Sequence, residues 1–253
     1  MTDTTSTPTT GQVILVGGGP GDPGLLTIAG RDALSVADVV VTDRLGPIAA
    51  IAEHAPQAEV IHVGKIPRGE FTPQERINEL LVEHARAGRT VVRLKGGDGY
   101  LFGRGGEEWI ACTDADIPVT IVPGVSSAFS VPALAGIPVT HRGLSQGVAV
   151  VSGHVAPDDP RSEVDWAGLA TSRLTLVVLM GVATLGAIAD ALVAAGLSAD
   201  TPAACIADGA SPSQRVVRAP LSQIASAADE GGFAPPAITV IGDVVEALSG
   251  TDG

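Results

Sequence analysis

The sequence predicts an α/β protein with two α/β domains. Short runs of Val, Ile, Leu and Ala alternate with segments of helical spacing, which is the pattern of parallel βαβ units. Several of these runs end in glycine-rich loops, where open α/β sheets bind ligands. The chain has 253 residues, of which 45% are hydrophobic and 17% charged, so it can bury a core. We expect a loose tail over residues 1–11, an N-terminal domain over 12–143 and a C-terminal domain over 147–249.

In the first domain, each predicted strand is a short apolar run that ends at a polar or glycine-rich loop. Asp22 followed by Pro23 predicts the start of a helix that runs to about Val36. Thr72 opens a capping box with Pro73 at the first helical position, so a second helix follows it, and residues 105–114 form a third. The predicted strands are 12–16, 37–41, 60–63, 90–94 and 119–122.

The second domain repeats this alternation from Gly147 onward. Helices are predicted over 184–195 and 221–228. The segment 214–218 is short and close to its neighbour, which makes it a candidate for antiparallel pairing. The predicted strands are 148–152, 174–179, 203–207, 214–218 and 237–241. Because only seven residues of the whole chain are aromatic, we expect an aliphatic core.

Composition and charge narrow the functional classes. The net charge of −13 argues against nonspecific binding to nucleic acid or to an anionic membrane. The first ten residues have neither a basic nor an apolar region, so we predict a cytoplasmic protein. Cys112 and Cys205 lack metal-ligand spacing, and no metal site is predicted. Residues 61–104 hold eight Lys and Arg against five Asp and Glu, which suggests either a pocket for an anionic small molecule or ordinary helix-surface charge.

A glycine-rich loop over residues 17–24 follows the first predicted strand. Residues 19–24 match the GxGxxG pattern, and Asp43 follows at the end of the next strand, as in dinucleotide-binding sites. Pro20 and Pro23 each lack the N–H group that such a loop offers to pyrophosphate. An NAD-dependent oxidoreductase and a purely structural turn are both alternatives at this point.

Two further loops follow predicted strands. The many glycines of residues 95–108 suggest backbone pressed closely against a ligand. Ser126 and Ser127 follow the fifth strand, where their hydroxyl groups would bind a ligand or cap the next helix. Lys65 and Lys95 are the only lysines of the chain, and each lies at the end of a predicted strand, where Lys can titrate or donate as Arg cannot.

In their order and spacing, these segments resemble the tetrapyrrole methylase family. The resemblance extends from about Gln12 to Val245, nearly the whole chain. Within the family, the run 95–108 and the Thr-His-Arg element at 140–142 are most similar to the enzymes that methylate uroporphyrinogen III. The matching stretches are 16–23, 42–45, 63–65, 74–78, 93–108, 136–142 and 180–181.

The resemblance implies an activity and a cofactor. It implies S-adenosylmethionine-dependent C-methylation of uroporphyrinogen III at C2 and C7, which gives precorrin-2 for cobalamin or sirohaem synthesis. S-adenosylhomocysteine would be the second product, the cofactor would lie in the cleft between the domains, and the protein would be a homodimer. The alternatives are a methyltransferase for a later corrin precursor, the NAD-dependent oxidoreductase, and a regulator that binds the cofactor without catalysis.

The resemblance also implies roles for individual residues. Asp43 and Lys65 match the family's proton-transfer pair, with Asp43 as the base and Lys65 as the acid. The implied cofactor contacts are Pro20, Gly96, Gly97, Asp98, Leu101, Ser126, Ser127, Met180 and Gly209. Because the substrate carries many carboxylates, the candidates for binding it are Arg44, Arg68, Arg104 and Arg142. The chain departs from the family pattern at Thr42, Ile66, Glu70, Gly99 and Tyr100, on the expected substrate side.

Overall fold

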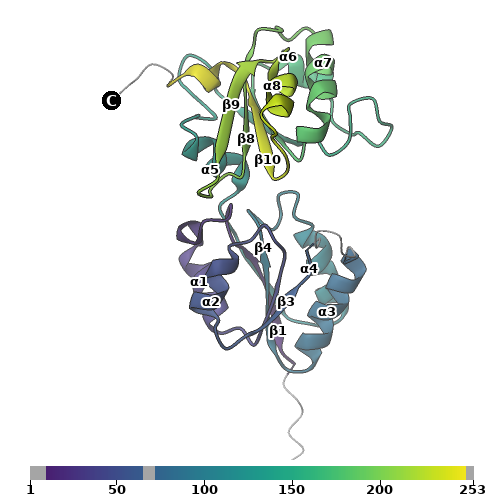
Figure 1. Ribbon diagram of the computed structural model, residues 1–253. Coiled ribbons are helices and arrows are strands. Elements are labelled where there is room, and N and C mark those ends of the chain that lie inside the picture. The colour runs from purple at the N-terminus through teal and green to yellow at the C-terminus, as the bar shows by residue number, and fades with distance from the viewer. Residues whose placement is uncertain (1–9, 65–71, 249–253) are drawn as a thin grey trace, which may run out of the picture. The chain divides into compact units, whose positions relative to one another are not determined.

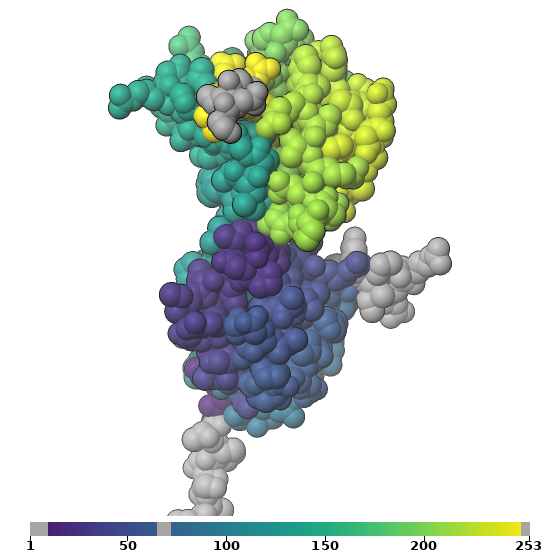
Figure 2. Space-filling view, turned by 60° about the vertical axis from the view of Figure 1, so that its left-hand side comes forward, coloured from purple at the N-terminus to yellow at the C-terminus, as the bar shows by residue number. Residues whose placement is uncertain are grey.

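The computed structural model describes residues 10–64 and 72–248 (Figure 1). The chain divides into two compact units, one up to Ser126 and one from Ser127 onward. Each unit contains a five-stranded sheet. Figure 2 shows the surfaces of the two units, the first in purple and blue and the second in teal to yellow.

The division between the units lies before helix α5 (Ser127–Leu134), whereas the sequence pattern placed it near residues 143–147. The physical reason is that α5 packs on β7 (Thr175–Leu179) and β10 (Ala237–Ile241), two strands of the second sheet. The helix therefore belongs to the second unit, although it follows directly on the last strand of the first.

The sheet of the first unit is entirely parallel, with the strand order β3-β2-β4-β1-β5. The strands are β1 (Gln12–Gly17), β2 (Val39–Thr42), β3 (Glu59–His62), β4 (Thr90–Lys95) and β5 (Val119–Val122). All five predicted strands are confirmed, with ends that shift by at most two residues. Because all the strands run in one direction, the loops after them lie along one edge of the sheet.

Helices cover both faces of this sheet (Figure 1). One core joins the sheet to α1 (Ile28–Ser35) and α2 (Ile48–His54). The other joins it to α3 (Gln74–Arg86) and α4 (Gly105–Asp114). Successive side chains of a strand point to opposite faces, so Val92 packs toward α1 and α2 and Val91 toward α3 and α4. Arg93 therefore follows Val91 onto the face covered by α3 and α4.

Two predicted helix starts are wrong. The predicted helix 22–36 is a 3₁₀ turn over Pro23–Leu25, capped by Asp22, followed by α1, whose N-cap is Thr27. The chain breaks there because Thr27 Oγ1 accepts a hydrogen bond from Gly30 N and its backbone is extended. The capping box at Thr72 does not form, since the N-cap of α3 is Pro73 and no side chain caps this helix.

The sheet of the second unit is mixed, with the order β6-β7-β10-β8-β9. Its other strands are β6 (Val148–Ser152), β8 (Pro202–Ala207) and β9 (Arg215–Pro220). β6 and β7 pair parallel, and the pairings of β10 with β7, of β10 with β8 and of β8 with β9 are antiparallel, which confirms the expectation for β9. Since β7 and β8 both oppose β10, they run in the same direction, and their carboxyl ends share one edge.

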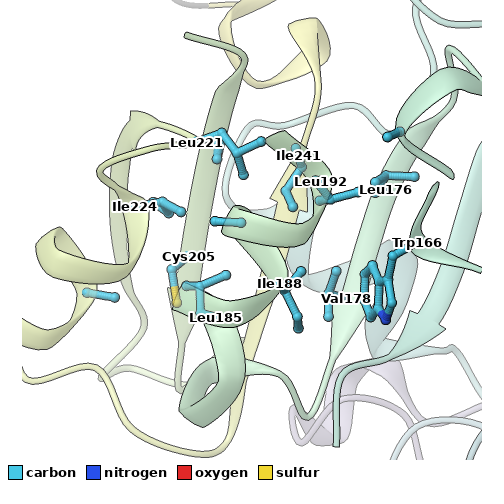
Figure 3. Packing of buried hydrophobic residues seen from close by; sticks show 14 residues of the cluster. Trp166, Leu176, Val178, Leu185, Ile188, Leu192, Cys205, Leu221, Ile224 and Ile241 are labelled. Carbon is cyan, nitrogen blue, oxygen red and sulfur yellow. The ribbon is translucent and has the colours of Figure 1, made fainter. Parts of the chain in front are cut away.

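The core of the second unit is aliphatic, as composition predicted. Helices α6 (Trp166–Thr171), α7 (Leu185–Ala194) and α8 (Ile224–Glu230) pack on the sheet. Figure 3 shows Leu185, Ile188 and Leu192 of α7 among Val178 and Cys205 of the strands. Helices α2 and α6 were not predicted from the sequence, and they have only seven and six residues. Over the residues that the structure describes, no helix is both long and apolar enough to cross a membrane.

Candidate functional site

The glycine-rich loops after β1 and β4 meet at the carboxyl edge of the first sheet. Gly18 N donates a hydrogen bond to the carbonyl oxygen of Lys95 at 2.7 Å. Gly19 and Gly97 exchange two backbone hydrogen bonds, at 2.6 and 3.1 Å. The two loops that the sequence singled out are therefore joined directly by their backbones.

The loop after β5 packs against both of them at Gly124. A Cβ atom on Gly124 would lie 2.3 Å from the carbonyl oxygen of Gly97 and 2.5 Å from the carbonyl carbon of Gly17. Only glycine permits this approach, and Gly97 also has a left-handed backbone with φ +65°. Sequence analysis attributed the glycines of the β4 loop to contact with a ligand, and here backbone packing requires them as well.

Asp98 holds these loops together through both of its carboxylate oxygens. Oδ1 accepts a hydrogen bond from Tyr100 N at 2.9 Å, and Oδ2 accepts one from Gly124 N at 3.1 Å. Gly96 lies under the loop after β2, since a Cβ atom there would be 2.5 Å from Leu45 Cβ. Pro20, Leu101 and Ser126 are partly buried in the same set of loops. The predicted cofactor residues of the first unit thus lie in the loops along one sheet edge.

Asp43 lies directly after β2, and two groups among the described residues hydrogen-bond to its carboxylate. Oδ1 accepts a hydrogen bond from Leu45 N at 3.0 Å, and Oδ2 accepts one from Arg93 Nη2 at 3.2 Å. The side chain of Asp43 is 24% exposed, so solvent and small molecules can reach it. Its predicted partner Lys65 lies outside the described residues, as do Arg68, Ile66 and Glu70.

Behind Asp43 lies a buried cluster of charged groups, which consists of Arg93, Lys95 and Glu108. Lys95 Nζ donates to both oxygens of Glu108 at 2.9 Å, and Arg93 Nε donates to Glu108 Oε1 at 2.9 Å. Gln74 Nε2 also donates to Oε1, at 3.3 Å. Glu108 is fully buried, and Arg93 and Lys95 are each 4% exposed at the side chain. Glu108 therefore hydrogen-bonds to both Arg93 and Lys95 inside the fold.

Burial dominates the electrostatics of this cluster. Desolvation, with the neighbouring charge of Arg93, lowers the pKa of Lys95 below its ordinary value, and Glu108 opposes that shift. Sequence analysis noted Lys95 but assigned no role to Arg93, Glu108 or Gln74. The signal was present, because Arg93 and Lys95 alternate on one face of an otherwise apolar strand, and two cations on a buried face require a buried acid.

Of the predicted substrate arginines, Arg44 and Arg104 lie on exposed loops of the first unit. Arg104 has a left-handed backbone at the N-cap of α4, and its guanidinium donates to both oxygens of Glu107, at 2.7 and 2.5 Å. This hydrogen bonding raises the pKa of Arg104 and lowers that of Glu107. Arg44 follows Asp43 directly and lies beside Gly64, where an added Cβ would be 3.1 Å from Arg44 Cγ.

The second unit carries its own group of predicted cofactor residues. Met180 follows β7 with a left-handed backbone of φ +59°, and 49% of the residue is exposed. Gly209 follows β8 between Asp208 and Ala210, both of which are also left-handed. Residues held in such conformations cluster at functional sites. A Cβ on Gly209 would lie 2.4 Å from Val131 Cγ1 of α5, the helix that begins at Ser127.

Arg142 is exposed and lies elsewhere in the second unit. It belongs to a turn closed by two backbone hydrogen bonds between His141 and Ser145, both at 3.0 Å. Ser145 Oγ accepts a hydrogen bond from Thr175 N, at the amino end of β7. Met180 follows the carboxyl end of the same strand, so within this unit the structure does not bring Arg142 together with Met180.

Residues 12–225 match the profile of the tetrapyrrole (corrin/porphyrin) methylases. The chain belongs to this family. As a tetrapyrrole methylase it has the two α/β units that the resemblance implied. The family also excludes the NAD-dependent oxidoreductase as an explanation of the loop after β1, in agreement with the missing N–H groups of Pro20 and Pro23.

Individual tetrapyrrole methylases are similar over nearly the whole chain. The uroporphyrinogen III methyltransferase of Methanosarcina barkeri, named as S-adenosyl-L-methionine-dependent, is 48% identical over 236 residues, which are 93% of this chain and 92% of that protein. The uroporphyrin-III C-methyl transferase of Thermus thermophilus, solved with S-adenosylhomocysteine, is 41% identical with a TM-score of 0.78, over 94% and 100% of the two chains. A cobalt precorrin-4 methyltransferase has a TM-score of 0.83 at 26% identity, over 96% and 99%.

Substitution of Gly124 by Ala tests the junction of the three loops. The added Cβ would overlap the backbone at Gly97 and Gly17, so we expect Gly124→Ala to lower the free energy of unfolding by about 2 kcal/mol. Gly106→Ala is the matched control, because a Cβ there meets nothing within 4 Å and Ala favours the helix. Denaturant unfolding measures both variants, and equal stabilities would contradict the packing described above.

Substitution of Glu108 by Gln tests the buried cluster. It leaves Lys95 without its carboxylate partner and Arg93 with only that of Asp43, and we expect the free energy of unfolding to fall by about 3 kcal/mol. Glu107→Gln is the matched control, since its ion pair with Arg104 is half exposed and such pairs contribute little. Thermal unfolding at pH 7 compares the two, and a Glu108→Gln variant as stable as its control would show that the cluster does not need its anion.

Proposed function

We propose that this protein is an S-adenosylmethionine-dependent uroporphyrinogen-III C-methyltransferase, which methylates its substrate at C2 and C7 and forms precorrin-2. The observation that carries the proposal is the 48% identity to the Methanosarcina barkeri enzyme over 93% of this chain. That similarity spans both units and therefore all the loops described above. The structure solved with S-adenosylhomocysteine supports the choice of cofactor.

The residues present fit S-adenosylmethionine. In the first unit, Gly96 and Gly97 offer bare backbone and Asp98 a fixed carboxylate, which accepts hydrogen bonds from hydroxyl or amino groups. In the second unit, Met180 and Gly209 lie in strained loops at strand ends. The proposed contacts are Pro20, Gly96, Gly97, Asp98, Leu101, Ser126, Ser127, Met180 and Gly209. When bound, S-adenosylmethionine supplies a methyl group on a positively charged sulfur.

The substrate is a polycarboxylate, and the protein carries a net charge of −13, so local cations must bind it. We assign this role to Arg44, Arg68, Arg104 and Arg142. The pair of Arg104 with Glu107 is about half exposed, and such pairs are worth little, so a substrate carboxylate can replace Glu107 as the partner. Bidentate contacts from arginine would hold and orient the tetrapyrrole.

Asp43 is the proposed base. Its carboxylate is held by Leu45 N and Arg93 yet remains partly exposed, so it can accept a proton from a substrate bound over the loop. Lys65 is the proposed acid. The homodimer implied by the family resemblance and the cytoplasmic location predicted from the N-terminal sequence stay predictions.

Anaerobic incubation with uroporphyrinogen III and S-adenosylmethionine, read by mass spectrometry, tests the function. We expect a product heavier by two methyl groups. A protein that binds S-adenosylhomocysteine in the same sample but transfers no methyl group to uroporphyrinogen III would contradict the proposed substrate. The second candidate is then a later corrin precursor, which the fold similarity to the cobalt precorrin-4 methyltransferase favours.

Asp43→Asn tests the proposed base. The amide cannot accept the proton, so we expect turnover to fall by about 100-fold or more, with affinity for S-adenosylhomocysteine unchanged. Asp32→Asn is the control, since Asp32 lies exposed on α1 and pairs with Arg31. Calorimetry measures binding, and mass spectrometry measures turnover. Turnover near that of the unmodified protein would remove Asp43 from the mechanism.

A further inference from the structure

Arg93 joins the proposed base to the buried charged cluster. Its Nη2 donates to Asp43 Oδ2 at 3.2 Å, and its Nε donates to Glu108 Oε1 at 2.9 Å. The guanidinium is 4% exposed at the side chain, whereas Asp43 is 24% exposed. One planar group therefore contacts a fully buried carboxylate at one edge and a solvent-accessible carboxylate at another.

The orientation of the Arg93 guanidinium is fixed by every one of its nitrogens. In addition to the two contacts with carboxylates, Nη1 donates to the carbonyl oxygens of Val41 and Leu94, at 3.3 and 3.0 Å. These partners lie on β2 and on β4 itself, at the centre of the sheet. A planar donor set held in this way cannot rotate without breaking several buried hydrogen bonds.

Glu108 is held as firmly as Arg93. It accepts hydrogen bonds from Lys95 of β4, from Arg93 and from Gln74 of α3, while it belongs to α4. Its position is thus set by three packed elements of the first unit. The position of Arg93 Nη2 follows from this frame and not from the loop that carries Asp43.

Asp43 itself lies in a loop and depends on Arg93. Leu45 N fixes only Oδ1, and it belongs to the same short loop. Among the described residues, the hydrogen bond from Arg93 Nη2 to Oδ2 connects the carboxylate to the sheet. Buried ion pairs are weak contributors to stability compared with apolar packing, so stability alone does not explain why the cluster extends to a partly exposed carboxylate.

We propose that Arg93 is a positioning residue, which orients the carboxylate of Asp43 for proton transfer, and that Glu108 and Lys95 hold Arg93 in place for this task. The inference rests on the proposed function, in which Asp43 is the base. On this proposal, the buried cluster of Arg93, Lys95 and Glu108 contributes to catalysis by positioning Asp43, in addition to its structural role.

Arg93→Lys tests the inference because it keeps the positive charge that Glu108 needs. A single ammonium group cannot occupy the positions of both Nε and Nη2, so the link between Glu108 and Asp43 is lost. We expect kcat for methylation to fall 10- to 100-fold, with KM for S-adenosylmethionine and affinity for S-adenosylhomocysteine changed less than twofold. Arg89→Lys is the matched control, since Arg89 lies just before the same strand and pairs with Glu59 on the surface.

A double variant separates positioning from general damage. If Arg93 acts through Asp43, the losses of Arg93→Lys and Asp43→Asn do not multiply, and the double variant turns over at about the rate of Asp43→Asn alone. Single-turnover reactions followed for hours by mass spectrometry resolve such slow rates. Arg93→Gln replaces Arg93→Lys in both measurements if the lysine variant does not fold.

Three results would overturn the inference: a kcat of the Arg93 variant equal to that of the control, losses that multiply in the double variant, or full activity of Asp43→Asn. The failure of the proposed function is a different result. In that case the unmodified protein itself would transfer no methyl group to uroporphyrinogen III, whereas here it is active and only the Arg93 variant contradicts the expectation.

Discussion

The buried ion pairs of Glu108 with Arg93 and Lys95 are the interaction on which the first unit depends. Glu108 is the shared partner of Arg93 and Lys95, two cations that β4 places on a buried face of the sheet. Burying three ionised groups carries a large desolvation penalty, and only short hydrogen bonds to every partner offset it. Glu108 therefore ties α4 to the central strand of the sheet, and through Gln74 it also reaches α3. The loops of the site project from this fixed frame.

A second constraint acts at the carboxyl edge of the same sheet. Gly17, Gly97 and Gly124 bring three strand ends into backbone contact, and Asp98 bonds across them. Close backbone contact leaves little freedom for the loops and excludes side chains from their meeting point. The close packing of the three loops therefore requires these glycines even when no ligand is bound.

The local sequence pattern was enough to predict the strands and the loops of the candidate site. Each strand of the first unit contains an apolar run, and a polar or glycine-rich loop follows it. The capping box predicted at Thr72 is absent, because the helix begins one residue later than the pattern requires, with Pro73 as its N-cap. β10 lies between β7 and β8 because it pairs with both strands. These pairings join segments that are far apart in the sequence, so a local sequence pattern does not predict them.

The same contrast between local and long-range features applies to the residues of the site. Asp43, Asp98 and the glycines were visible because they end strands, and their roles came from the family resemblance. Arg93 and Glu108 were not recognised, although both lie in a stretch that matches the family. Their contact joins a strand to a helix, and only the three-dimensional structure shows that these two elements place the side chains together. The signal in the sequence was the alternation of Arg93 and Lys95, which indicates that a buried acid exists but not which one.

Two kinds of arginine in the first unit differ in whether they are available to the proposed polycarboxylate substrate. Arg93 is buried, and its carboxylate partners are fixed by the fold, so it is unavailable to a substrate. Arg104 forms a half-exposed pair with Glu107, which costs little to exchange. Burial thus decides which cation orients the protein's own carboxylate and which can bind a carboxylate from outside.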